Sequence, residues 1–304
     1  MPEPDPFVAA LHEGRQRFLA LVADIRPDLH RYCARMTGSV AEGEDIVQDT
    51  LARAYYALSE VEQMPPLRPW LFHIAHNRAL DFLRRYDRRM GRSIDDVADT
   101  ATTAGDPEEA MARAEAARAA ISRFGELPPV QRSSVILKDV LGHSADEIGQ
   151  LLGLSVPAVK AALHRGREQL RALAESAPDE APPAPRATSP GIARYVALFN
   201  ARDWDGVRAM LAEDVRLDLV SRAQRAGRGD VSTYFTKYDA VNDWYLVPAW
   251  VDGREVVGVF RERGGARLDY FVELTTERGA ITVIKDFRYV PYITVDAAIV
   301  VARE

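Results

Sequence analysis

The chain has 304 residues, of which 47% are hydrophobic and 28% charged, and its net charge is −6. This length exceeds one typical domain, and the composition is that of folded globular proteins, which excludes a disordered or fibrous chain. A uniformly acidic protein gains no counterion-release energy on a polyanion, so only local basic segments can bind nucleic acid.

The first residues and the apolar runs bear on the location of the protein. Met1–Pro6 is acidic and rich in proline, and no basic stretch precedes an apolar run, so we expect no secretion signal. No window approaches the roughly 18 continuous apolar residues that a membrane span needs. The single Cys33 cannot form an internal disulfide, and it shares a helical face with Leu29, Tyr32 and Met36, which places it in the core. We therefore expect a cytoplasmic protein with no membrane contact.

Residues 7–92 carry apolar stripes at three-to-four spacing, which predict a compact helical module. Within it, Arg68–Arg92 holds seven arginines and two aspartates, a local charge of +5 in an acidic protein. Aromatic side chains beside guanidinium groups suit a single strand, whose bases stack while arginines hold its phosphates. The alternative is that Trp70, Leu71 and Phe82 fill the core and that the arginines are solvated.

The helix expected before this segment has the opposite character. Its polar face carries Glu44, Asp45, Gln48 and Asp49 behind an apolar stripe. Such a patch can dock on a basic protein partner. Acidic first turns are also common because they favour the helix dipole, so this pattern gains meaning only together with its neighbours.

Two segments divide the chain into three parts. Residues 93–109 hold six acidic and no basic side chains, so they cannot bury enough apolar surface to fold. We therefore expect this segment to be an acidic linker. Residues 175–190 hold five prolines and no large apolar residue, which predicts an extended, semi-rigid tether. A second helical module is thus expected over 110–174, and a third domain over 191–304.

The second helical module contains a predicted helix-turn-helix. Ser144 and Glu147 have the spacing of a capping box that begins a helix. Gly153 then stands where a positive φ turns the chain, Ser155 can cap the next helix, and Pro157 is tolerated in its first turn. The second helix would enter the major groove, and the alternative is a helical hairpin with a solvated basic face. The side chains expected near bases or phosphates are Ser155, Lys160, His164, Arg165, Arg167 and Arg171.

The third domain begins with one helix and continues as β-rich stretches joined by turns that contain glycine, which predicts an α+β domain with a curved antiparallel sheet. Trp244, Trp250, Phe260 and Tyr270 either line a small-molecule pocket or fill the interior. All six histidines of the chain precede the tether. The domain therefore lacks a histidine for acid–base catalysis or an imidazole metal site, and we expect no catalytic residue, metal or cofactor.

Taken together, the stretches from residue 15 to 173 resemble sigma factors of the extracytoplasmic-function group. Residues 44–51 are similar to the helix of domain 2 that binds RNA polymerase, and 68–85 to its minus-ten reader. Residues 126–148 with the helix-turn-helix resemble domain 4, which reads the minus-thirty-five element. The resemblance implies core RNA polymerase, through its β′ clamp and β flap, and promoter DNA as partners.

The resemblance also assigns roles to single residues. It implies polymerase contacts for Asp45, Gln48 and Asp49, with Glu44 beside them. The recognition helix departs from the family in one respect: Ala161 and Ala162 stand where family members commonly have a polar Ser-Arg pair. The promoter sequence that the family reads therefore cannot be assigned to this chain. Residues implied at or beside the melted minus-ten strand are Asn77, Arg78, Asp81, Arg84, Arg85 and Arg88.

Residues 191–304 resemble the SnoaL-like, nuclear-transport-factor-2-like cone. The predicted architecture is therefore multidomain, with two all-α sigma domains, a helical bundle and a helix-turn-helix, before an α+β cone. The predicted function is a non-enzymatic sigma factor whose C-terminal domain modulates activity through a small-molecule ligand or an intramolecular contact. The alternative is a helix-turn-helix regulator fused to a small-molecule-binding or cyclase-like domain, which would not bind core polymerase.

Overall fold

The computed structural model describes residues 6–58, 60, 62–90, 121–176, 187–239, 244–262, 265 and 267–302. The chain divides into two compact units, Met1–Pro178 and Asp179–Glu304. The predicted acidic linker at 93–109 and the side chain of Arg88 lie outside the described residues, as does most of the predicted tether.

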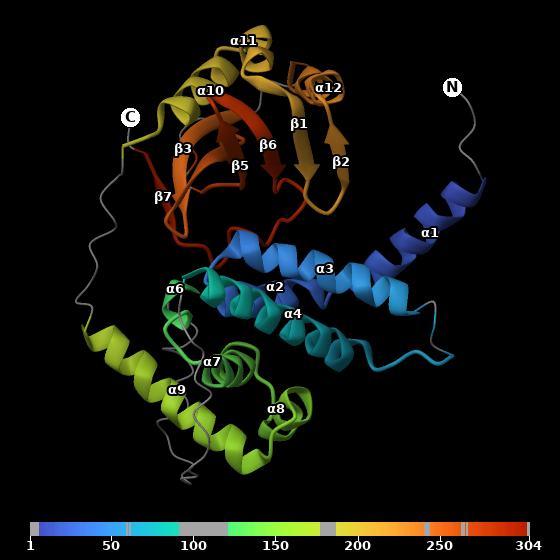
Figure 1. Ribbon diagram of the computed structural model, residues 1–304, viewed down its shortest axis with the longest axis vertical. Helices are drawn as coiled ribbons and strands as arrows, with labels where there is room; N and C mark the ends of the chain where they lie inside the picture. The colour runs from blue at the N-terminus through green and yellow to red at the C-terminus, as the bar shows by residue number, and fades with distance from the viewer. Residues whose placement is uncertain are drawn as a thin grey trace. The chain divides into compact units, whose positions relative to one another are not determined.

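The described residues of the first unit form helices joined by turns and contain no strand, in agreement with the sequence (Figure 1). Spacing on α2 predicted that Leu29, Tyr32, Cys33 and Met36 share a buried face, and all four are fully buried. The helices are α1 (Pro6–Leu21), α2 (Arg26–Thr37), α3 (Val40–Leu58), α4 (Leu67–Met90), α6 (Ile121–Phe124), α7 (Pro129–Val135), the π-helix η1 (Ile136–Val140), α8 (Ala145–Leu152) and α9 (Val156–Ser176).

Helices α2, α3 and α4 pack closely around one another. Gly38 ends α2 at a φ of 80°, a conformation that side chains other than glycine rarely adopt. At Gly43 a Cβ atom would lie 2.5 Å from the backbone nitrogen of Ala34, so α3 crosses α2 with no room for a side chain. The Tyr32 hydroxyl lies 2.7 Å from Nδ1 of His76, which joins α2 to α4 through a buried hydrogen bond.

The helix-turn-helix expected over residues 144–171 is confirmed as α8 and α9. The Ser144 hydroxyl accepts from the Glu147 N–H at 3.2 Å, and the Glu147 carboxylate accepts from the Ser144 N–H at 2.7 Å. Gly153 has a φ of 70°, and the Ala158 N–H donates to the Ser155 hydroxyl at 3.3 Å. Both caps and the turn therefore form as the residue types require.

The second unit begins with a helix and continues in strands, as predicted, but α11 and α12 are two further helices that the sequence analysis did not predict. Its elements are α10 (Pro190–Asn200), α11 (Trp204–Ala209), β1 (Leu211–Leu219), β2 (Ala223–Ala226), α12 (Arg228–Asp239), β3 (Tyr245–Val251), β4 (Arg254–Phe260), β5 (Tyr270–Glu277), β6 (Ala280–Asp286) and β7 (Ile299–Val301).

The strands form one curved seven-stranded sheet in the order β2-β1-β6-β5-β4-β3-β7 (Figure 1). The pairs are antiparallel except β1 with β6, which run parallel, so the sheet is mixed where the sequence predicted an antiparallel one. The parallel pair arises because the chain passes through β2, α12 and then β3, β4 and β5 before β6 returns beside β1. Helix α10 packs on β3 and β4, and α12 packs on β1 and β2.

Candidate functional site

Of the four side chains predicted to bind polymerase, Asp45 is exposed on α3, whereas Glu44 is fully buried. The Glu44 carboxylate accepts a hydrogen bond from the guanidinium of Arg26, a residue of α2. Glu44 was expected on the docking face, and the structure corrects this placement because its charge is used to join α2 and α3. Gln48 is half-buried, and its Nε2 atom has no hydrogen-bond partner among the described residues.

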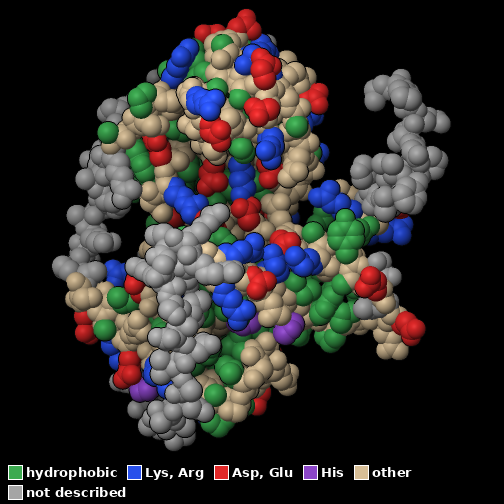
Figure 2. Space-filling view, viewed as in Figure 1, with side chains coloured by type: hydrophobic (Ala, Val, Ile, Leu, Met, Phe, Trp, Pro, Cys, Tyr) green, Lys and Arg blue, Asp and Glu red, His purple; other side chains and the backbone are tan. Residues whose placement is uncertain are grey.

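Asp49, the fourth of these residues, connects the acidic helix to the basic one. Its carboxylate accepts from Arg78 of α4 and from Arg53, whose Nε lies 3.2 Å from Oδ1. Arg78 also donates to Asp81 at 3.0 Å. Figure 2 shows Lys and Arg side chains gathered where α3 and α4 lie in Figure 1. The predicted polymerase surface and the predicted minus-ten reader thus share one network of ion pairs.

The remaining predicted residues of α4 lie on its accessible side. Asn77 and Arg84 are exposed, and Nδ2 of Asn77 lies 3.2 Å from Nε2 of His73. Arg85 is exposed as well, and its Nε donates to the carbonyl oxygen of Asp81 at 3.2 Å. The ring of Tyr86, the next residue, stacks on that of Phe82 one turn earlier, with ring centroids 6.3 Å apart and planes 18° apart. The helix therefore presents amide, guanidinium and aromatic groups together.

The recognition helix α9 separates its predicted DNA contacts into two groups. Lys160 and His164 are exposed, and Ser155 caps the helix, while Arg165 is half-buried. Arg167 instead donates two hydrogen bonds, at 2.9 and 2.6 Å, to the fully buried carboxylate of Asp139. Its guanidinium therefore points into the unit, which places it away from the surface that the sequence prediction assumed.

The small residues of α9 face the helices beneath it. Ala161 and Ala162, which replace the polar pair common in the family, are both buried. At Gly166 a Cβ atom would lie 2.7 Å from Cγ2 of Val135 in α7. The glycine that lowers helix propensity is thus required by the close packing of α9 on α7.

The two helical modules pack together into a single buried apolar cluster. Nδ1 of His73 in α4 lies 3.4 Å from the carbonyl oxygen of Leu151 in α8, and the rings of Phe72 and His143 meet edge to face at 5.4 Å. Arg132 of α7 donates to the carbonyl oxygen of Met36 in α2. The minus-ten candidate helix and the first helix of the helix-turn-helix are therefore side by side.

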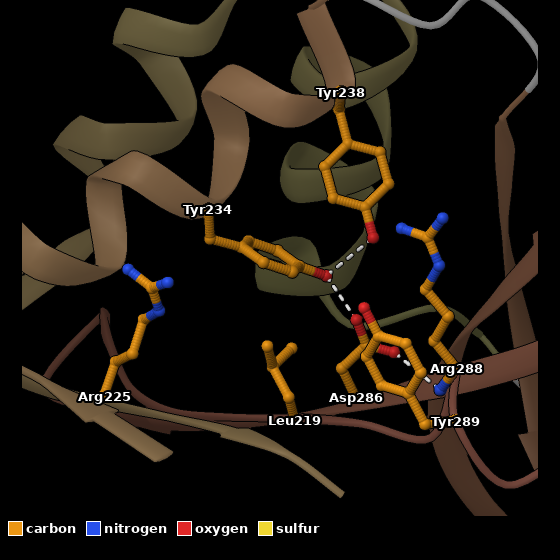
Figure 3. Close-up of a pocket in the computed structure, with 7 residues that line it drawn as sticks. All are labelled: Leu219, Arg225, Tyr234, Tyr238, Asp286, Arg288 and Tyr289. Atoms are coloured by element: carbon orange, nitrogen blue, oxygen red, sulfur yellow. Dashed lines mark hydrogen bonds between the residues drawn. The ribbon is translucent and has the colours of Figure 1, made fainter. Parts of the chain in front are cut away.

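The second unit holds a small cavity below α12, beside the end of β6 (Figure 3). The cavity is partly open to solvent, and its volume of about 30 Å³ is room for about two water molecules or one carboxylate group. The residues that line it are Leu219, Arg225, Tyr234, Tyr238, Asp286, Arg288 and Tyr289.

Asp286 lies at the centre of a hydrogen-bonded chain. Its Oδ2 accepts from the Tyr234 hydroxyl at 2.6 Å, and its Oδ1 accepts from the Arg288 N–H at 2.9 Å. The Tyr234 hydroxyl lies 3.0 Å from that of Tyr238, which lies 3.4 Å from that of Tyr270. Burial raises the pKa of the Asp286 carboxyl, and the hydrogen bond from Tyr234 offsets part of that rise.

None of the four aromatic residues predicted for a pocket lines this cavity, but two lie beside it. Trp244 lies 4.6 Å beneath the guanidinium of Arg288, and Tyr270 contributes the last hydroxyl of the chain. Trp250 and Phe260 are buried on β3 and β4. Sequence reasoning missed the lining residues, although one signal was present: Tyr234 and Tyr238 are one helical turn apart.

Within the described ranges, no group of three or more His, Cys, Asp or Glu side chains is arranged to hold a metal ion. The helices of that same part of the chain are too short or too polar to span a bilayer.

The chain is similar to known families along its first unit. The family Sigma-70 region 2 matches residues 21–89, and Sigma-70, region 4 matches residues 117–170. The ECF RNA polymerase sigma factor SigW of Bacillus subtilis is 31% identical over 54% of this chain and 92% of its own length. SigG of Mycobacterium tuberculosis is 34% identical over 64% of this chain, and the match spans 58% of SigG.

A solved structure that covers both units is also similar. The extracytoplasmic function sigma factor SigJ of Mycobacterium tuberculosis is 23% identical, and the alignment covers 88% of this chain and 95% of SigJ at a TM-score of 0.36.

Proposed function

Since this chain belongs to the extracytoplasmic-function group of RNA polymerase sigma factors, we propose that it binds core RNA polymerase and directs promoter-specific transcription initiation. The observation that carries the proposal is the pairing of an acidic helix, α3, with a basic and aromatic helix, α4, through Asp49 and Arg78. A protein that read DNA through its helix-turn-helix alone would have no use for this arrangement.

In this proposal α3 docks on the β′ clamp of the polymerase. Asp45 is the exposed carboxylate of the predicted set, and Asp49 and Gln48 border it with partly exposed side chains. Exposed carboxylates steer a protein toward a basic surface and fix its orientation there. The second polymerase contact, to the β flap, is assigned to the helix-turn-helix module by family resemblance.

Promoter DNA then contacts two separate helices. Asn77, Arg84 and Arg85 of α4 are placed for the melted minus-ten strand, because exposed amide and guanidinium groups bind bases and phosphates. Lys160, His164 and Arg165 of α9 are placed for the minus-thirty-five element in the major groove.

The packing of the first unit implies a change of arrangement on the promoter. The resemblance assigns the two modules to two separate elements of the promoter, whereas helices α4 and α8 touch each other through His73 and Leu151. We therefore infer that the modules separate when the protein engages polymerase and promoter.

We assign a modulating role to the second unit, by a small-molecule ligand or an intramolecular contact that shifts the population between closed and open arrangements. Enzyme chemistry is not proposed, because Asp286 is the one carboxylate that lines its cavity, and both of its oxygens already accept hydrogen bonds. The neighbouring hydroxyls of Tyr234 and Tyr238 are buried, which raises the pKa of both and keeps them protonated. The proposed location of this activity is the cytoplasm.

Run-off transcription with purified core polymerase tests the central proposal. We expect promoter-dependent transcripts from the full chain, and their loss in D45R, because reversal of an exposed charge removes the docking attraction. E62R makes the same charge change at another exposed acid near the end of α3 and should leave transcription unchanged. Failure of the wild-type chain to bind core polymerase would leave only the alternative, a helix-turn-helix regulator.

The modulating role has a separate test. A chain that ends at Ser176 retains the described helices of the first unit, and its transcripts are compared with those of the full chain. Identical activity and promoter choice would contradict a modulating second unit.

A further inference from the structure

We propose that the cavity of the second unit binds the carboxylate of a small aromatic acid, with the guanidinium of Arg288 as its main anchor. This binding site goes beyond the sigma-factor function and does not depend on it.

The first argument is the balance of charge around the cavity. Arg225 and Arg288 both line it, and Asp286 is the one carboxylate there. Among the described residues neither guanidinium forms an ion pair within 4 Å, and the Arg225 side chain donates to the Thr233 hydroxyl at 2.9 Å. Burial raises the pKa of the Asp286 carboxyl, and the charge of Arg288 lowers it only from a distance. The mouth of the cavity therefore carries two cations and attracts an anion.

The second argument is the direction of the hydroxyl chain. The Tyr234 hydroxyl has one hydrogen, which it donates in a hydrogen bond to Asp286 at 2.6 Å. Its oxygen therefore accepts the hydrogen bond with the Tyr238 hydroxyl at 3.0 Å. Each hydroxyl of the chain thus points its proton inward, toward the carboxylate. An anionic ligand at the mouth finds its donors on the guanidinium groups, which also match a carboxylate in bidentate geometry.

The third argument is that Arg288 is held in place before any ligand arrives. Its backbone N–H is bound to Asp286 at 2.9 Å, and its guanidinium lies over Trp244, 4.6 Å from the ring centroid. The ring of Tyr238 is 5.8 Å away and that of Tyr289 is 5.9 Å away. Arg288 is exposed, but contacts with three aromatic rings restrict its guanidinium, so it loses less freedom on binding than an unrestricted side chain would, which favours affinity.

The fourth argument is size. The cavity volume of about 30 Å³ admits a carboxylate but no ring. The ring of Tyr289, which is 39% exposed, stands at the same mouth and lies 4.9 Å from the guanidinium of Arg222. The body of the ligand therefore rests against an exposed aromatic side chain, which suits a planar aromatic acid.

The test is a binding titration of the full-length protein with benzoate, followed by isothermal calorimetry and by tryptophan fluorescence, since Trp244 lies under the anchor. Benzamide has nearly the same shape without the charge, and acetate has the carboxylate without the ring. We expect benzoate to bind at least tenfold more tightly than either. Equal binding of benzamide would overturn the anionic site, and equal binding of acetate would overturn the aromatic part.

Two variants assign the site. R288Q should weaken benzoate binding tenfold or more, since charge-assisted hydrogen bonds are lost, and R288K, which keeps the charge but not the bidentate geometry, should weaken it less. R194Q removes an exposed arginine from α10 and should bind as the wild type does. Benzoate affinity that is unchanged in a folded R288Q protein, judged by an unaltered thermal transition, would exclude this site.

Discussion

Asp139 in the first unit and Asp286 in the second are both buried, yet the two units satisfy them differently. Asp139 receives a bidentate guanidinium from Arg167, whereas Asp286 receives a tyrosine hydroxyl and a backbone N–H. The guanidinium of Arg167 is thus largely buried and stabilises the fold. The guanidinium of Arg288 instead lies at the mouth of a cavity, where it is available to bind a ligand. Burial of a charge thus indicates a function only when its partner is known.

The largest expected effect comes from breaking the ion pair of the first unit. R167A leaves the Asp139 carboxylate buried without its cation, which should lower the free energy of unfolding by about 3–5 kcal/mol. K160A, which removes an exposed cation from the same helix, should change it by less than about 0.5 kcal/mol while weakening promoter binding. Denaturant unfolding measures both, and an R167A protein of wild-type stability would return Arg167 to the DNA-binding set.

Acid should destabilise the first unit through His76. Burial lowers the pKa of His76 to about 4 from an ordinary value of 6.5, so the unfolded chain binds the proton more readily. Stability is then full above about pH 6.5 and falls as the pH drops toward 4, by roughly 3 kcal/mol. Urea unfolding across this range should show that the free energy of unfolding of the wild type rises with pH. This dependence on pH should be weaker in H76N and unchanged in H164N, which changes an exposed histidine. The same dependence in H76N would assign it to other groups.

The second unit should respond more mildly when Asp286 loses a donor. Y234F removes the hydroxyl that donates at 2.6 Å, and we expect a loss of about 1–3 kcal/mol because a buried acceptor is left short of a partner. Y289F deletes the hydroxyl of a partly exposed ring and should cost less than about 0.5 kcal/mol. Thermal unfolding compares them, and equal transitions would show that the hydroxyl chain is not structural.

The smallest expected effects on stability are those of two substitutions on α3, which distinguish a residue that only binds polymerase from one that also stabilises the fold. D45N should leave stability within about 0.5 kcal/mol of wild type and reduce affinity for core polymerase, because this carboxylate is exposed. D49N should reduce affinity and also lower stability by up to about 1 kcal/mol, since it loses Arg78 and Arg53. Competition for core polymerase combined with unfolding curves tests this, and a D45N protein with unchanged affinity would contradict the docking face.

Local rules predicted much of the fold. The apolar face of α2, the capping box at Ser144 and the turn at Gly153 all depend on residues within a few positions of one another. The parallel pairing of β1 with β6 and the π-helix at Ile136–Val140 were not predicted, since both depend on how distant segments pack.

The sequence by itself determined the helical and strand segments, the caps and the local charge of each helix, because these follow from propensity and spacing along the chain. Only the tertiary structure decided which charges remain available. Glu44 meets Arg26 and Arg167 meets Asp139 across helices, and Asp286 meets Tyr234 across 52 positions. A charged side chain is paired or presented according to its neighbours in space, and burial makes an unpaired charge too costly to leave.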